Sequence, residues 1–347
     1  MSFNYISTLM LSSPLRSSIV GNQSALSKAS KEATTGRFAD VGLELGTLTG
    51  RDVSLRADLA FADRLVDTNG LVSGRLDVTQ NRIERTISTA QDFLKDLIAA
   101  RGTANGGQII LPGAAANLQD LIGSLNATFN GSSVFAGLNT LTPPLASYAA
   151  GSTSKVAVDT AFQTFFGFPQ TSPAVSAITP AQMQTFLNTS FDTEFTSPAW
   201  NTNWSSATNQ VLSSRISTNQ VTNTSVSAND PNFRKLAEAY TALSDLGTAN
   251  MSQSTFQVVV DKAIGLVSSA IDGLAVVGGN VGTVQQTVTN ASSRLKLQHD
   301  ILNQQIVASE KVDPTDASVR VNTLQNQIET ALALTSRLQR ISLLNYL

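Results

Sequence analysis

The stretch VGTVQQTVTNASSRLKLQHDIL, residues 281–302, decides the fold because its apolar positions follow a heptad repeat. The repeat positions are Val281, Val284, Val288, Ala291, Leu295, Gln298 and Leu302, which step by 3, 4, 3, 4, 3 and 4. An apolar residue at every 3.5 positions forms one stripe along a helix, and that stripe packs against a second helix. The polar position, Gln298, lowers stability but can fix the register of the pair. The segment therefore predicts a long helix with a partner along its length.

A matching pattern in the N-terminal third supplies the expected partner helix. Its stripe contains Leu55, Leu59, Ala62, Val66, Asn69, Val72 and Leu76, and resumes at Ile83, Ile87, Ala90, Leu94 and Leu97. A helix from about 48 to 101 would be on the order of 80 Å long. We expect the two segments to pair as a coiled-coil seam that takes part in self-association. The predicted seam residues are Leu55, Leu59, Val66, Leu76, Val281, Val284, Val288, Leu295 and Leu302.

Both chain ends read as further helices. Residues 4–34 form a weakly amphipathic pattern that Gly36 can close. In DPTD, residues 313–316, Asp313 can cap a new helix and Pro314 suits its first turn. The last helix is expected to dock through Leu324, Ile328, Leu338, Ile341 and Leu344. Its apolar surface exceeds one stripe, so two interpretations stay open: an intramolecular helix bundle, or docking onto other copies of the chain.

Composition excludes several classes of function. The formal charge is −2, with 23 basic and 25 acidic residues, so no basic face for nucleic acid is expected. The chain has no cysteine and one histidine, His299, which leaves no thiolate or multi-histidine metal site and little room for a catalytic triad. We therefore expect no enzyme activity, no catalytic residue, no cofactor and no metal. The first twenty residues make a poor signal peptide, and no segment reaches 18 uninterrupted apolar residues, so we expect no membrane insertion.

The middle of the chain differs from both ends. Between Gly102 and Asp230 only Lys155 and Arg215 are basic, and nine of the fifteen phenylalanines lie between Phe129 and Phe195. This uncharged, aromatic and proline-broken composition predicts an inserted domain. The aromatic run FQTFFGFP, residues 162–169, fits either the core of that domain or a surface that stacks on sugars. The helical framework stops at GSSVFAGLNTLTPP, residues 131–144, where the middle begins.

Three segments resemble the family of bacterial flagellins and their hook-associated relatives. They are SKASKEATTGR (28–37) with Thr35, Gly36 and Arg37, VGTVQQTVTNASSRL (281–295), and the closing helix from residue 321. Within that family, SSVFAGLNTLTPPL (132–145), with Phe135, Ala136 and Gly137, is similar to the segment of hook-associated protein 3, the hook–filament junction branch, of rhizobial type. Filament flagellins usually carry another sequence there.

The resemblance implies a fold that is mainly α, a long antiparallel helical bundle formed by the N- and C-terminal segments with an inserted β-rich domain. The implied domains are a terminal helix at 1–40, a helical rod at 41–140 and 233–312, a variable outer domain at 141–232, and a terminal polymerisation helix at 313–347. It further implies a secreted structural protein of the flagellum that passes through the flagellar type III export system. The implied partners are other copies in a ring, flagellin, a second hook-associated junction protein and an export chaperone. A divergent filament flagellin, and a ligand-binding or adhesin role of the middle domain, are the alternatives.

Overall fold

The computed structural model describes residues 8–344, with side chains described for residues 13–338 and for residue 340. The chain folds as two compact units. The terminal unit holds residues 1–64 and 295–347, and the body unit holds residues 65–294. The boundary falls inside the two longest helices, α3 (Thr49–Arg101) and α10 (Gln253–Glu310), so each of these helices contributes to both units.

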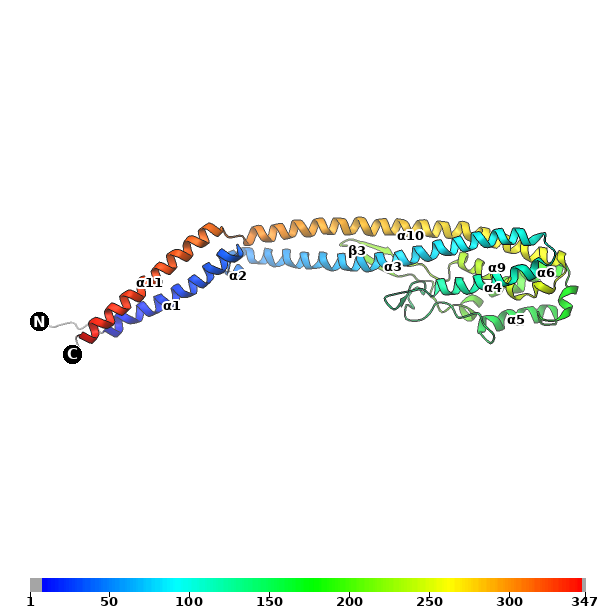
Figure 1. Ribbon diagram of the computed structural model, residues 1–347, viewed down its shortest axis with the longest axis horizontal. Coiled ribbons are helices and arrows are strands. Elements are labelled where there is room, and N and C mark those ends of the chain that lie inside the picture. Colours follow the sequence, from blue (N-terminus) through cyan, green and yellow to red (C-terminus); the bar gives the residue numbers. More distant parts are fainter. Residues whose placement is uncertain (1–7, 345–347) are drawn as a thin grey trace. The chain divides into compact units, whose positions relative to one another are not determined.

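The terminal unit is built from helices of both chain ends. Its elements are α1 (Thr8–Thr35), α2 (Val41–Leu45), the 3-10 turn η1 (Gly46–Leu48), the first part of α3, the last part of α10, and α11 (Pro314–Leu344). α1 and α11 lie side by side and antiparallel, with the start of α1 beside the end of α11 (Figure 1). The first and last helices of the chain therefore form one pair.

Among the described apolar side chains of α1 and α11, only alanines are fully buried. Ala29, Ala317 and Ala331 are 3%, 0% and 9% exposed, whereas Leu324, Ile328 and Leu338 are half-buried. Other apolar side chains of the same helices lie in water: Val20, Val319, Leu332 and Leu334 are 65%, 58%, 52% and 47% exposed. Because a half-buried leucine keeps part of its apolar area in water, the pair gains only part of the free energy that full burial would give.

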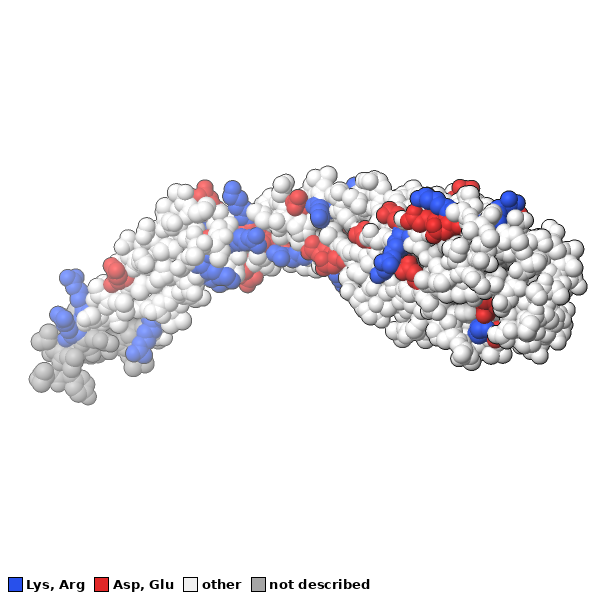
Figure 2. Space-filling model, turned by 45° about the vertical axis from the view of Figure 1, so that its right-hand side comes forward, with Lys and Arg blue, Asp and Glu red and all other residues white. Residues whose placement is uncertain are grey.

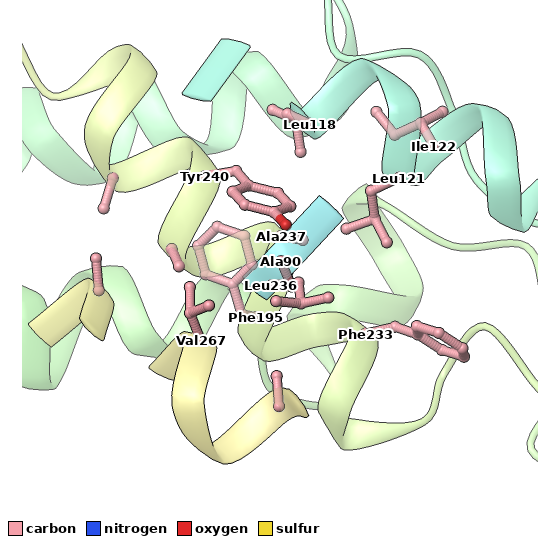
Figure 3. Packing of buried hydrophobic residues seen from close by; sticks show 14 of the residues in the cluster. Ala90, Leu118, Leu121, Ile122, Phe195, Phe233, Leu236, Ala237, Tyr240 and Val267 are labelled. Carbon is pink, nitrogen blue, oxygen red and sulfur yellow. The ribbon is translucent and has the colours of Figure 1, made fainter. Parts of the chain in front are cut away.

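The body unit places four helices around one core. It contains the remainder of α3, α4 (Gly106–Leu125), the strands β1 (Thr128–Phe129) and β2 (Ser132–Ser133), α9 (Pro231–Asp245), the 3-10 turn η4 (Thr248–Asn250) and α10 up to residue 294. Figure 3 shows side chains of α3 (Ala90), α4 (Leu118, Leu121, Ile122), α9 (Leu236, Tyr240) and α10 (Val267) in one apolar cluster. α9 is buried on nearly all sides, as expected of a central helix.

Part of the apolar surface of α10 packs into this core. By length and composition alone α10 could cross a membrane, and it is the one such helix among residues 8–344. Its buried positions in the core are Val259, Val260, Ala263, Val267, Ala270 and Leu274. Because they recur every three or four residues, they form one helical face that packs into the body unit.

The insert between β2 and α9 is held together by aromatic side chains. Its elements are α5 (Thr153–Phe166), the 3-10 turn η2 (Pro173–Ala177), α6 (Pro180–Phe186), the π-turn η3 (Leu187–Phe191), α7 (Asp192–Glu194), α8 (Ala199–Asn203), β3 (Ser213–Ser217) and β4 (Gln220–Asn223). Phe162, Phe186 and Phe191 are fully buried, and Trp200 stacks on Trp204 with ring centroids 5.4 Å apart. In the run 162–169, Phe162 thus belongs to the core, whereas Phe165 remains 37% exposed.

The structure confirms the predicted fold class, with long helices from both chain ends and a small sheet in the insert. The sheet of the insert is limited to the antiparallel pair β3–β4, with a bulge between Arg215 and Ser217, so the β content is lower than the resemblance implied. Local capping explains the helices that replace the expected strands. Ser152 caps α5, whose end is fixed by Gly167 at φ +83°, and Thr179 forms a capping box with Gln182 at α6.

Glu238 is a carboxylate buried in the body unit on α9. Its side chain is 4% exposed, and Oε1 lies 3.4 Å from Nζ of Lys262 on α10. The same ammonium group lies 3.2 Å from Oδ1 of Asn188 and 3.8 Å from Oδ1 of Asp192. Burial raises the pKa of Glu238 to about 7, because the opposing effect of Lys262 is smaller.

At pH 8 we expect Glu238→Gln to raise the free energy of unfolding by about 2–3 kcal/mol. The folded pKa lies above the ordinary value of 4.5, so between these values the folded chain binds more protons than the unfolded chain. Stability from this group is therefore present below pH 4.5 and is lost as the pH rises to 7. Urea unfolding followed by tryptophan fluorescence at pH 4.5 and pH 8 measures the difference. Glu84→Gln, at an exposed position of α3, is the control; an equal gain from Glu238→Gln at both pH values would contradict the assignment.

Candidate self-association site

The turn after α1 meets the segment between α10 and α11. The amide of Gly36 donates to the Glu32 carbonyl at 2.8 Å, and Gly36 adopts φ +67°. The amide of Val312 donates to the Gly36 carbonyl at 2.9 Å, and the amide of Phe38 donates to the Glu310 carbonyl at 3.0 Å. Thr35, Gly36 and Arg37 therefore lie where the two chain ends come together, and the backbones of Arg37 and Lys311 form an isolated antiparallel β-bridge.

A carboxylate with two arginines is buried beside this turn. Glu310 is 1% exposed, and its carboxylate accepts from Nη1 of Arg37 at 3.4 Å and from Nη2 of Arg56. Arg56 Nε also donates to Oδ2 of Asp52 at 2.9 Å, and Ser309 Oγ donates to Oδ1 of Asp52 at 3.2 Å. The hydrogen bond that Arg56 donates to Glu310 raises the pKa of Arg56, so its charge is retained at every accessible pH. We call Arg37, Asp52, Arg56, Ser309 and Glu310 the Glu310 cluster.

A second buried carboxylate connects α1 with α11. Glu32 is 5% exposed and accepts from the Ala39 amide at 3.2 Å and from Nη2 of Arg320 at 3.1 Å. At the start of α11, Asp313 Oδ1 accepts from the Thr315 amide at 2.8 Å, which lowers the pKa of Asp313. Pro314 is the first residue of α11, where its missing amide hydrogen removes no helix bond. The start of α11 is thus held by the Asp313 cap, and its next turns are held by the ion pair between Arg320 and Glu32 of α1.

We expect Glu310→Ala to loosen the join between the two chain ends and to lower stability by about 1–2 kcal/mol. Removal of the buried carboxylate leaves Arg37 without this ion pair and Arg56 with Asp52 alone, but both arginines are about half exposed and remain hydrated, which limits the loss. Amide hydrogen exchange of Gly36, Phe38 and Val312 should quicken, while exchange in the core of the body unit stays unchanged. Exchange at unchanged rates in all three would mean that the backbone bonds hold the join by themselves. Lys311→Ala, at the exposed neighbouring position, is the control.

The predicted seam residues all turn inward within one chain. In the terminal unit Leu295 and Leu302 are buried, and Leu55 and Leu59 are half-buried. In the body unit the buried ones are Leu76, Val281 and Val288, and the half-buried ones are Val66 and Val284. The seam thus keeps only partly exposed apolar side chains for other copies, and the fully exposed apolar side chains lie elsewhere.

The predicted docking residues of α11 are only partly covered. Leu324, Ile328 and Leu338 are half-buried, while the side chains of Ile341 and Leu344 lie outside the described ones. The sequence did not predict that Val319, Leu332 and Leu334 are the more exposed apolar residues of α11. It also gave no sign of the Glu310 cluster. Leu332 and Leu334 were visible as apolar residues beyond the stripe, but no spacing links Arg37, Arg56 and Glu310 in the sequence.

Phe135, Ala136 and Gly137 form a strap across the body unit. Phe135 is fully buried and lies edge-on to Phe233, with ring centroids 5.7 Å apart. The Phe135 carbonyl accepts from the Ala228 amide at 2.8 Å, and the Ala136 carbonyl accepts from the Thr208 amide at 3.1 Å. The segment therefore joins the beginning of the insert to its end.

Two further contacts hold the strap in place. Arg75 of α3 donates through Nη2 to the carbonyls of Ser133 at 2.6 Å and Val134 at 3.2 Å, and burial lowers the pKa of Arg75. Gly137 adopts φ +63°, and a Cβ there would lie 2.3 Å from Oγ1 of Thr208 and 2.5 Å from the Gln210 carbonyl oxygen. Only glycine fits this position without a shift of the neighbouring chain.

The other candidate groups have structural surroundings. His299 lies 3.5 Å from Asp63 and 3.2 Å from Asp300, on the flank of α10. Asp92 pairs with Lys95 on the exposed side of α3. The glycines of residues 276–282 lie inside the continuous helix α10. Within residues 8–344, no group of three or more His, Cys, Asp or Glu side chains is arranged to hold a metal ion.

Two regions of the chain match known families. Residues 6–140 match the bacterial flagellin N-terminal helical region, and residues 264–347 match the bacterial flagellin C-terminal helical region. Together they cover more than half of the 347 residues and contain the whole Glu310 cluster. No curated protein matches the chain. The matched regions contain both chain ends and the strap, and most of the insert lies outside them.

Proposed function

Because the chain belongs to the bacterial flagellin family and is a structural component of the flagellum, we propose that it acts as the adapter between hook and filament. Flagellins are extracellular and polymerise with copies of themselves, and the family is structural rather than enzymatic. In the proposed role the copies form a ring between flagellin and a second hook-associated junction protein. The chain leaves the cell through the flagellar type III export system, with an export chaperone as a further partner.

The observation that carries the junction role is the strap. Residues 132–145 resemble the segment of the junction branch, and the strap explains why that segment needs these residue types. Phe135 fills the core beside Phe233, and Gly137 occupies a position closed to any side chain. The similarity therefore rests on residues with a defined structural task.

The proposed contacts with other copies are made by the exposed apolar side chains of α1 and α11. Val20, Val319, Leu332 and Leu334 project into water from a pair in which the leucines are at most half-buried. Exposed apolar side chains of this kind are typical of interaction sites. Two helices that bury little against each other gain the missing apolar contacts from neighbouring copies.

Deletion of the gene followed by electron microscopy of the cells tests the function. The expected result is hooks without filaments, with flagellin shed into the medium, and recovery on return of the intact gene. Intact filaments in the deletion strain would exclude the junction role. Hooks without filaments and without shed flagellin, together with thousands of copies per filament in the wild type, would instead identify a filament flagellin.

The ligand-binding alternative has less support. An aromatic platform for sugars needs several exposed rings, but within residues 162–169 only Phe165 exceeds one third exposure, and Phe162 and Phe166 pack on Phe186. Most of the aromatic area of the run is used in the core of the insert. We therefore propose no ligand for it.

A further inference from the structure

We propose that an apolar loop of the body unit, residues 138–141, inserts into a groove on the body unit of a neighbouring copy. The loop and the groove both belong to the body unit and lie outside the α1–α11 pair. The inference rests on the proposed function only in that copies of the chain meet side by side. It adds a second contact, with a defined knob and a defined hole.

The knob is formed by Leu138 and Leu141, which follow the strap. Leu141 is 89% exposed and Leu138 is 48% exposed. A leucine at this exposure lacks most of the stabilisation that burial would give. A loop that holds it in water is therefore typical of an interaction site.

The knob is held rigidly although it projects into solvent. The Leu138 amide donates to Oγ1 of Thr208 at 2.8 Å, and Asn139 Nδ2 donates to the Ser206 carbonyl at 2.7 Å. Within the loop, the Thr142 amide donates to the Asn139 carbonyl at 3.1 Å, and Pro143 and Pro144 follow. A preorganised loop loses little conformational freedom on binding, which favours association.

The hole is a groove of about 400 Å³ over α3 and α10. Leu76, Val277, Val281 and Val284 form its apolar floor. Its volume lies within the range of cavities that accept several side chains. The groove can therefore take the side chains of Leu138 and Leu141 together.

The lack of charge on both the knob and the groove favours a second copy of the chain as the occupant of the groove. No charged residue occurs between Gly131 and Ser154, so the knob is neutral. The groove is rimmed by amides and hydroxyls such as those of Asn223 and Asn280. Its one charged residue, Asp230, is engaged as the cap of α9, where Oδ1 accepts from the Asn232 amide at 2.9 Å.

The rest of the insert is also poor in charge. Between Gly102 and Asp230 only Lys155 and Arg215 are basic, and Figure 2 shows few Lys, Arg, Asp and Glu side chains at the end of the body unit nearest the viewer. A strongly charged partner would find few complementary groups on such a surface. Because each copy carries one knob and one groove, a knob in the next copy's groove repeats from copy to copy, as a ring requires.

The absence of cysteine from the chain allows a direct test by disulfide cross-linking. Leu141→Cys and Asn280→Cys are introduced into one full-length chain, expressed in the deletion strain, and flagella are isolated and oxidised. We expect cross-linked ladders in multiples of the chain mass in assembled flagella and none in the dilute monomer. Leu141→Cys combined with Ser254→Cys, an exposed site of α10 about 40 Å along the helix from Asn280, is the matched control and should give no ladder.

Other results would overturn the proposal. Assembled flagella without a ladder would show that the knob does not reach a neighbouring groove. A cross-linked band that is no multiple of the chain mass would assign the groove or the knob to a different protein. A ladder in the dilute monomer would indicate non-specific oxidation and would equally reject it.

A variant without cysteine provides an independent readout. Leu141→Asp places a charge on the knob, and we expect the amount of assembled protein to fall at least ~tenfold. Leu141 contributes nothing to the core, so folding, followed by tryptophan fluorescence, should stay unchanged. Undiminished assembly of this variant would overturn the inference and leave the junction role, which the gene deletion tests separately.

Discussion

A chain that ends at Asp313 is expected to keep a folded body unit and to lose assembly altogether. The core of the body unit is formed by residues between Val72 and Ala291, so α11 contributes no side chain to it. Removal of α11 leaves α1 without its antiparallel partner and deletes the exposed Val319, Leu332 and Leu334. Urea unfolding followed by Trp200 and Trp204 reports on the body unit, and sedimentation of polymers reports on assembly.

A double variant separates the loss of the helix from the loss of its exposed apolar side chains. Leu332→Gln with Leu334→Gln keeps a good helix-forming sequence and changes only exposed side chains. We expect α11 to stay helical by circular dichroism and assembly to fall at least ~tenfold. If the truncated chain instead loses its folded body unit, α11 serves an intramolecular bundle, and the docking surface on α11 is rejected.

Gly137→Ala is expected to lower the free energy of unfolding of the body unit by about 3–5 kcal/mol. The new Cβ would lie 2.3 Å from Oγ1 of Thr208 and 2.5 Å from two carbonyl oxygens, so the strap or the neighbouring segment must shift. The backbone at φ +63° adds strain for any residue with a side chain. Urea unfolding monitored by tryptophan fluorescence measures the loss.

Gly131→Ala is the matched control for this substitution. Gly131 has φ +76° in the turn between β1 and β2, but no atom lies within 4 Å of its added Cβ. It shares the backbone strain without the clash, so the expected loss is about 1 kcal/mol. Equal losses of unfolding free energy for the two variants would show that the strap moves to accept the new Cβ at no cost, and the assigned role of Gly137 would be wrong.

The long helices could be predicted because their information is local and repeated. The heptad positions of 281–302 identify a helix that needs a partner, and the turn signals at Gly36 and at 313–316 mark breaks that the structure places within one or two residues. Amphipathic repeats of this length leave few alternatives to a paired helix. The fold class follows from them.

The helices of the insert and the Glu310 cluster could not be predicted, for different reasons. In the insert, caps such as Ser152 and Thr179 outweighed an aromatic composition that also suits strands. In the cluster, the partners Arg56 and Glu310 are 254 residues apart, and no local pattern records which arginine meets which carboxylate. Long-range ion pairs follow from the packing and leave no periodic signal in the sequence.

The alanine contact of α1 with α11 has a consequence for the kinetics of growth. Ala29, Ala317 and Ala331 are fully buried between the helices, while the larger apolar side chains of the pair stay half-buried or exposed. If neighbouring copies cover these side chains, ordering of the ends is coupled to addition. Two free copies that collide lack those neighbours, so we expect a lag phase before growth in the absence of a seed. Elongation from a preformed edge should proceed without that lag, which would confine polymer formation to the place where the edge exists.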